Sequence, residues 1–189
     1  AQRRNLETAI KYASVPSGLQ RIFMLRLDMP KEKIAEIVYS LPEDMRNSPY
    51  GKSIQKHIDT DQIKEGDKLY KFECTTINGN PLEWNTINGK QVLLLYGGLG
   101  CMGADGRQYL EELYKETSRD DFVIIVYWPS SSLEELRNIH EAFPSDYITV
   151  SDFLQDQSMF KIVYGAQATP TCFLIDNEGK IVVKSVGLN

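Results

Sequence analysis

Hydrophobic positions divide the chain into a first part with helical spacing and a second part with strand-like runs. Before residue 60, apolar side chains recur every three or four positions, as at Leu6, Ile10 and Ala13, which is typical of amphipathic helices. Further helices are expected after Ser17, near Pro30 and after Ser48, where serine is a good N-cap and proline fits the first turn. Residues 1–60 are therefore predicted to form a small helical bundle.

A polar stretch that contains Gly66 follows this bundle. Its composition is typical of a boundary between structural units. We therefore expect two parts, a helical N-terminal segment over residues 1–60 and a second domain over residues 61–189.

The second part alternates between strand-like and helix-like patterns. Residues 91–98 and 121–128 are continuous apolar runs, typical of buried central strands, and residues 107–117 and 130–143 have helical spacing. In the first of these helices, one side is expected to carry Tyr109, Leu110, Leu113 and Tyr114. Extended pieces are expected over the ranges 69–77, 81–87, 169–176 and 180–187, the last two as a hairpin. The order predicts an α/β fold, a mixed sheet flanked by helices.

Composition and charge exclude several classes of protein. Hydrophobic residues make up 42% and charged residues 25%, with a net charge of −5 and no basic block, so nucleic-acid binding is not indicated. The longest apolar runs are too short to cross a bilayer, and the first ten residues lack the apolar core of a signal peptide. Three cysteines argue against a scaffold held by disulfides and leave room for one reactive thiol.

Two phrases of the second part resemble a known family. Residues 66–84, "GDKLYKFECTTINGNPLEW", are similar to the opening of TlpA, ResA and AhpC/TSA-like thioredoxins, the redoxin group. Residues 164–182, "YGAQATPTCFLIDNEGKIV", are similar to a second motif of that group, G-V-x-x-x-P-T-x-F-L-I-D-x-x-G-K-I. Pro170 stands at the proline of this motif. The resemblance covers residues 64–187 and implies a thioredoxin-like fold. The helical segment that ends in "NSPYGK" resembles the preface of such domains in envelope proteins of Bacteroidetes.

The resemblance implies a site made of a cysteine and a proline. It places Cys101 at the nucleophilic cysteine and Pro170 at a proline that follows a cis peptide and faces it. A cysteine at a helix N-terminus meets unpaired N–H groups and the positive end of the helix dipole, which favour the thiolate. The carbonyl of Thr169 would hold an extended substrate strand. Tyr96 is expected either to line the pocket or to pack in the core.

The sequence also departs from the family pattern. Ala104 stands where the family has its second cysteine, and Gly100 stands in place of the usual aromatic residue. Asp105 replaces a basic residue, and its negative charge opposes the thiolate. Arg107 could offset that charge. The sequence therefore predicts the fold of this family but not its usual two-cysteine chemistry.

The remaining candidates have plainer interpretations. Cys74 and Cys172 are expected to be buried core residues, although Cys74 would resolve a mixed disulfide if its Cα lay within roughly 7 Å of that of Cys101. His57 and His140 are expected on helix surfaces. No spacing of histidines and cysteines fits a metal, and no cofactor is implied.

Three functions remain open from the sequence. The first is a thiol–disulfide oxidoreductase that uses Cys101 alone, with a protein or a small thiol as substrate. The second is a thioredoxin-fold binding module that has lost catalysis and docks a protein partner through its helical segment. The third is an antioxidant peroxidase of the AhpC/TSA type, disfavoured because Gly98 stands where a Thr or Ser is usual. The resemblance implies a location in the bacterial cell envelope or periplasm.

Overall fold

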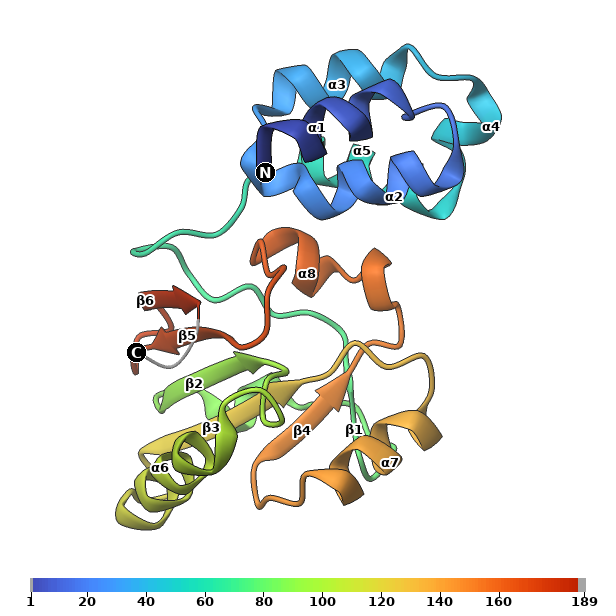
Figure 1. Ribbon diagram of the computed structural model, residues 1–189. Coiled ribbons are helices and arrows are strands. Elements are labelled where there is room, and N and C mark those ends of the chain that lie inside the picture. The colour runs from blue at the N-terminus through green and yellow to red at the C-terminus, as the bar shows by residue number, and fades with distance from the viewer. Residues whose placement is uncertain (1, 187–189) are drawn as a thin grey trace.

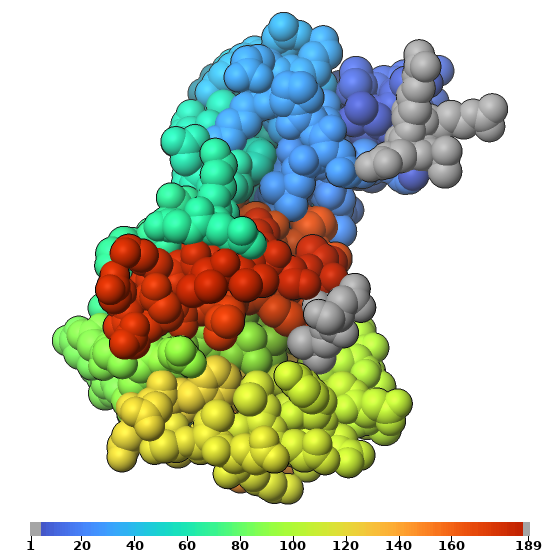
Figure 2. Space-filling view, turned by 90° about the vertical axis from the view of Figure 1, so that its left-hand side faces the viewer, coloured from blue at the N-terminus to red at the C-terminus, as the bar shows by residue number. Residues whose placement is uncertain are grey.

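The computed structural model describes residues 2–186, in which a helical bundle lies on a domain with a mixed β-sheet (Figure 1). Figure 2 shows the same two parts from another side, with the bundle in blue. The bundle contains α1 (Gln2–Lys11), α2 (Pro16–Leu25), η1 (Arg26–Asp28), α3 (Lys31–Tyr39), α4 (Glu43–Arg46) and α5 (Pro49–Asp59). Its own apolar core includes the fully buried residues Leu19, Ile22, Phe23, Ile34, Val38 and Ile54. The predicted bundle is confirmed, and burial of one face of each long helix explains why these segments are helical.

The start of α5 agrees with the expected signal, whereas that of α2 does not. The hydroxyl of Ser48 accepts a hydrogen bond from the amide of Gly51 at 3.2 Å and caps α5, which begins at Pro49. Helix α2 begins earlier than expected, at Pro16 with Val15 as N-cap, so Ser17 lies inside the helix. Proline has no N–H to lose at this position, which allows the earlier start.

A six-stranded sheet follows, in the order β1-β4-β3-β2-β5-β6. Its strands are β1 (Thr75–Thr76), β2 (Gln91–Tyr96), β3 (Phe122–Tyr127), β4 (Ile148–Ser151), β5 (Thr171–Ile175) and β6 (Ile181–Val186). Strand β3 pairs parallel to β2 and β4, whereas β5 pairs antiparallel to β2 and β6. The predicted central strands and the C-terminal hairpin are confirmed, and the mixed sheet flanked by helices is the predicted fold class.

Side chains alternate between two cores on the two faces of the sheet. One core contains Leu94 and Tyr96 with Phe160, and the other contains Leu95 with Leu110. Helix α8 (Met159–Val163) covers the first face, between the sheet and the bundle, and α6 (Gly103–Glu116) covers the second (Figure 1). Helix α7 (Leu133–Ala142) begins after Ser132, whose hydroxyl accepts from the amide of Glu135.

The stretch between the bundle and β2 differs from the expectation. Only Thr75 and Thr76 of residues 69–77 form a strand, because the chain crosses there from a bridge between Lys68 and Lys180 to a pairing of Thr75 with Ser151. In residues 81–87 the extended part is limited to Pro81, which forms an isolated antiparallel bridge with Thr75, since η2 (Trp84–Ile87) is a 3₁₀ turn. The indole of Trp84 donates to the Phe72 carbonyl at 2.8 Å, which fixes that turn against the core.

The sequence pattern also did not predict β4, η3 (Gln155–Gln157) and α8. The exposure of single residues differs as well. Tyr109 is 62% exposed, so it does not share the buried side of Leu110 on α6. In the part of the chain that is described, no helix is long and apolar enough to span a bilayer. The division at residue 60 stays a prediction.

Candidate functional site

Cys101 lies in a tight turn between β2 and α6. Its amide and that of Met102 both donate to the carbonyl of Gly98, at 2.9 and 3.1 Å. The first helical residue of α6 is Gly103, so Cys101 stands two residues before the helix rather than on it. The side chain is exposed, as a thiol that reacts with a partner must be.

Two glycines let this turn approach the chain before β5. A methyl group on Gly98, whose φ is +91°, would lie 2.4 Å from Cβ of Pro170. A methyl group on Gly97 would lie 3.3 Å from Cγ2 of Thr169. Only glycine accepts both the left-handed backbone and this close contact at position 98. The pair Gly97–Gly98 therefore brings the Cys101 turn against Thr169 and Pro170.

Thr169 is the residue that faces the thiol. Its hydroxyl oxygen lies 3.7 Å from the Cys101 sulfur, and both side chains are exposed. The Thr169–Pro170 peptide is cis, as the resemblance implies, and Pro170 is buried. The hydroxyl of Thr171 donates to the Ala168 carbonyl at 2.6 Å and stabilises the turn before β5. Three of the expected site residues, Cys101, Thr169 and Pro170, thus come together.

Phe143 is a neighbour of the site that the sequence did not indicate. A methyl group on Gly100 would lie 2.8 Å from Cζ of Phe143, so this ring fills the space that a side chain at position 100 would need. The ring stacks on Trp128, with centroids 6.0 Å apart. An aromatic group therefore does flank the Cys101 turn, but it comes from the end of α7.

Arg107 supports the same turn. Its guanidinium donates to the Leu99 carbonyl at 3.2 Å. Together with Leu99, Phe143 and Tyr147 it lines a cavity of about 240 Å³ beside the turn. Arg107, which the sequence suggested as a counter-charge to Asp105, thus forms a hydrogen bond with the backbone just before Cys101.

Tyr96 is not brought to the thiol. Its side chain is 4% exposed and lies in the core on the α8 face, where its ring packs against both Tyr127 and Phe160. Burial, followed by the charge of Asp156, raises the pKa of Tyr96 to about 12. The core-packing alternative describes its place in the structure, and we leave Tyr96 out of the site proposed below.

The other two cysteines are buried, as expected. Cys74 is 8% and Cys172 is 7% exposed, and neither forms a disulfide. Burial raises the pKa of Cys74 to about 12 and that of Cys172 to about 11. Both therefore stay protonated at neutral pH, and Cys101 is the exposed thiol among the three.

One of the two histidines, His57, differs from the expectation. His57 is 2% exposed rather than on a surface, because α5 packs against the sheet domain and Gln62 donates to its Nδ1 at 3.0 Å. His140 is partly buried on α7, with Thr149 3.3 Å from its Nδ1. Among residues 2–186, no group of three or more His, Cys, Asp and Glu side chains could hold a metal.

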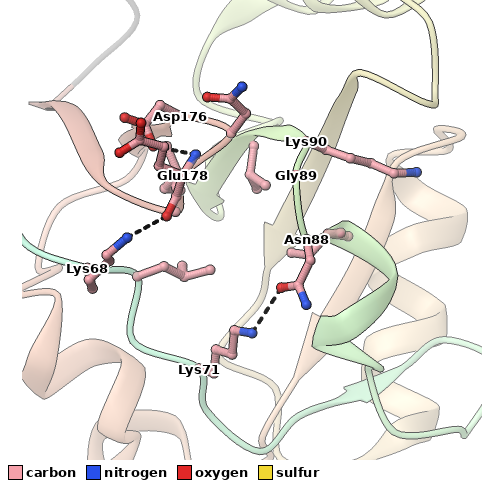
Figure 3. Close-up of a pocket in the computed structure, with 13 residues that line it drawn as sticks. Lys68, Lys71, Asn88, Gly89, Lys90, Asp176 and Glu178 are labelled. Carbon is pink, nitrogen blue, oxygen red and sulfur yellow. Dashed lines mark hydrogen bonds between the residues drawn. The ribbon is translucent and has the colours of Figure 1, made fainter.

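A further pocket lies at the opposite end of the sheet from Cys101. Its volume is about 340 Å³, and its wall includes Val92 at the start of β2 and Ile175 at the end of β5. Lys68 donates to the Glu178 carbonyl at 2.6 Å and Lys71 to the Asn88 side chain at 3.1 Å (Figure 3). Lys90 extends away from the pocket (Figure 3). The ammonium groups are thus bound to the protein itself, and this pocket is no part of the thiol site.

Comparisons with known proteins relate the sheet domain to thiol–disulfide oxidoreductases. No family model matches the chain. The thiol-disulfide oxidoreductase ResA of Bacillus thuringiensis is 26% identical over 132 residues, which cover 68% of this chain and 73% of that protein. The ResA protein of Bacillus subtilis is 26% identical over 123 residues, 65% of this chain and 67% of that protein.

Solved structures of similar fold include two from Bacteroides. The thioredoxin domain of a thiol-disulfide oxidoreductase from Bacteroides vulgatus has a TM-score of 0.58 and 23% identity, over 67% of this chain and 91% of that domain. A thiol-disulfide oxidoreductase from Bacteroides fragilis has a TM-score of 0.55 and 19% identity, over 66% of this chain and 92% of that structure. Strand order, site geometry and sequence likeness agree on a thioredoxin-like fold, which the sheet domain shares with these thiol-disulfide oxidoreductases.

Proposed function

We propose that this protein is a thiol–disulfide oxidoreductase that works through the single cysteine Cys101. The observation that carries the proposal is the exposed Cys101 thiol 3.7 Å from the hydroxyl of Thr169, in a turn held open to solvent. The names of the Bacillus relatives, thiol-disulfide oxidoreductase, support the same reaction. The substrate is a disulfide of a protein or of a small thiol.

The reaction is an exchange of sulfur–sulfur bonds. The Cys101 thiolate attacks one sulfur of the substrate disulfide; a bond forms between these sulfurs, and the other substrate sulfur leaves as a thiolate that takes a proton from water. A second thiol from outside then attacks the mixed disulfide and frees Cys101. This external thiol is needed because Ala104 stands three residues after Cys101, while Cys74 and Cys172 are buried.

Two groups beside the thiol serve this exchange in the proposal. The Thr169 hydroxyl is placed to donate to the sulfur anion as it forms or leaves. Ala168 and Thr169 are exposed, so an extended peptide that reaches Cys101 passes over them. Pro170 keeps this segment against Gly98. The site is thus open to a peptide as well as to a small disulfide.

A second candidate is a binding module of the thioredoxin fold. It is favoured by Ala104 and Asp105 in the first turn of α6, which offer neither a second thiol nor a positive charge near Cys101. In that case the exposed surface around Thr169 and Phe143 would bind a partner without chemistry. For either function we propose the bacterial cell envelope as the location, from the resemblance of the sequence.

Mass spectrometry of the folded protein separates the two candidates. After treatment with oxidised glutathione at pH 7.5, the oxidoreductase is expected to carry one glutathione on Cys101 and to lose it when a reduced thiol is added. Cys101→Ser is the matched control and is expected to gain nothing under these conditions. A folded wild-type protein that forms no adduct at Cys101 would exclude the oxidoreductase and favour the binding module.

A further inference from the structure

Arg26 is a fully buried arginine of the helical bundle that reaches into the sheet domain. It begins η1, directly after α2. Its guanidinium lies over the ring of Phe23, 4.1 Å from the centroid, and Nη1 donates to the Phe23 carbonyl at 2.9 Å. Burial lowers the pKa of Arg26 to about 10, so it is still a cation at neutral pH. A buried cation persists only where acceptors surround it.

Most of these acceptors belong to the chain that leads to Thr169. Nη2 donates to the carbonyls of Lys161 and Ala166, at 3.2 and 3.3 Å, and Nη1 donates to the side-chain oxygen of Gln167. The other end of the same amide donates to the Met24 sulfur at 3.0 Å. Gln167 is therefore held from two sides by residues at the end of α2 and the start of η1.

The segment that Arg26 holds ends beside the thiol. Ala166 and Gln167 come two or three residues before Thr169, whose hydroxyl is 3.7 Å from the Cys101 sulfur. Ala168 and Thr169 themselves are exposed. Hydrogen bonds flank these two residues on both sides: Thr171 donates to the Ala168 carbonyl, and Arg26 donates to the Ala166 carbonyl before them. The bundle lies on the side of α8, so this contact crosses between the two parts of the molecule (Figure 1).

We propose that Arg26 is a positioning residue: it fixes Ala166–Thr169 from the helical bundle and so sets the Thr169 segment against Cys101. The bundle thereby acts on the thiol site of its own chain. The effect on Cys101 chemistry rests on the function proposed above, whereas the effect on the segment does not. A peptide that passes over Ala168 and Thr169 needs this segment in place, but a small disulfide needs only the exposed sulfur.

Amide hydrogen exchange of the full chain tests the structural part. Arg26→Met removes the donors but keeps an unbranched apolar chain, and we expect residues 166–169 to exchange at least tenfold faster. Tyr50→Phe is the matched control, because the Tyr50 hydroxyl donates at the same contact, to Asp156 at 2.9 Å, without touching residues 166–169. Exchange in residues 166–169 that is unchanged in folded Arg26→Met, or equally raised in Tyr50→Phe, would overturn the inference.

Kinetics tests the chemical part. The rate of mixed-disulfide formation at Cys101 is measured with a peptide disulfide and with oxidised glutathione, at a temperature where each variant is fully folded. We expect Arg26→Met to lower the ratio of peptide rate to glutathione rate about tenfold, whereas a loss of stability alone would leave the ratio unchanged. A ratio equal to that of the wild type contradicts positioning for catalysis.

Gln167→Leu covers the case in which Arg26→Met does not fold. This variant keeps the bonds of Arg26 to Lys161 and Ala166 and removes the side-chain amide of Gln167, both its acceptor for Arg26 and its donor to the Met24 sulfur. We therefore expect at least threefold changes in the same exchange rate and the same rate ratio. Their absence would overturn the inference. A wild-type Cys101 that reacts with neither disulfide would refute the proposed function, and the exchange measurement would still decide the role of Arg26.

Discussion

The Cys101 sulfur lies 3.7 Å from the hydroxyl oxygen of Thr169, although 68 positions separate the two residues in the chain. Strands β2 and β5 pair antiparallel, with Tyr96 opposite Thr171, so the end of one strand and the start of the other meet at the same edge of the sheet. Gly98 then allows the two turns to touch. The site therefore forms because β2 and β5 are neighbours in the sheet and because the residue at position 98 is a glycine.

The first prediction concerns the Thr169 hydroxyl. Thr169→Val keeps the branched shape and removes the donor beside the sulfur, and we expect mixed-disulfide formation at Cys101 to slow roughly two- to tenfold, which corresponds to about 0.5–1.5 kcal/mol for one hydrogen bond. Stopped-flow or mass-spectrometric rates measure the effect. Thr86→Val, an exposed threonine in η2, serves as control. Equal rates in wild type and Thr169→Val would remove the hydroxyl from the proposed mechanism.

The second prediction concerns the contact between the two turns. Gly98→Ala would place a methyl group 2.4 Å from Cβ of Pro170 at a φ of +91°. Gly89→Ala has a similar φ of +80° and nothing within 4 Å of the added methyl group, so it pays only for backbone strain, about 1 kcal/mol. We expect Gly98→Ala to lose at least about 1 kcal/mol more of unfolding free energy in urea denaturation. Similar losses would show that the close contact is not required.

Much of the fold follows from local patterns that the sequence displays. The continuous apolar runs at residues 91–98 and 121–128 became β2 and β3 because a strand buried on both faces needs no alternation. Ser48 capped α5 because the cap depends only on three following residues. Features of this kind are determined within one turn of helix or one strand.

The features that were not predicted depend on contacts far apart in sequence. Strand β4 has four residues and exists because β3 and β1 pair with it on either side. Residues 81–87 alternate like a strand, but Trp84 packs on Phe72 and turns the chain. The Phe143 ring at Gly100 and the burial of His57 also result from packing between elements. No window of the sequence contains that information.

The third prediction concerns the selectivity of cysteine alkylation. Cys101 is exposed, whereas the pKa of Cys74 is raised to about 12 and that of Cys172 to about 11 by burial. At pH 7.5 we expect iodoacetamide to modify Cys101 at least about 100-fold faster than either of the others, since the thiolate is the reactive form. Peptide mapping by mass spectrometry identifies the modified residue. In urea all three are expected to react at similar rates, and rapid modification of Cys74 in the folded protein would contradict its buried position.

The last prediction concerns pH and the contact between bundle and sheet domain. Burial, followed by the charges of Arg26 and Lys31, lowers the pKa of His57 to about 4. In the unfolded chain a histidine has a pKa near 6.5, so below that pH the unfolded state binds a proton that the folded state does not. Stability that is present above pH 6.5 is therefore lost as the pH falls toward 4, on the order of 2 kcal/mol after allowance for solvent screening.

Urea denaturation between pH 7.5 and 4.5 measures this loss. His57→Gln cannot bind the proton, so we expect its unfolding free energy to vary less with pH than that of the wild type, whatever its value at pH 7.5. His140→Gln removes the other histidine, on α7, and is expected to keep the wild-type pH dependence. His57 lies at the contact between bundle and sheet domain, where it forms a hydrogen bond with the Arg26 backbone. We therefore expect the amides of residues 166–169 in the wild type to lose protection from hydrogen exchange at acid pH before the protein unfolds globally. Protection factors of residues 166–169 that stay constant across that pH range, after correction for the intrinsic pH dependence of amide exchange, would show that protonation of His57 does not reach the thiol site.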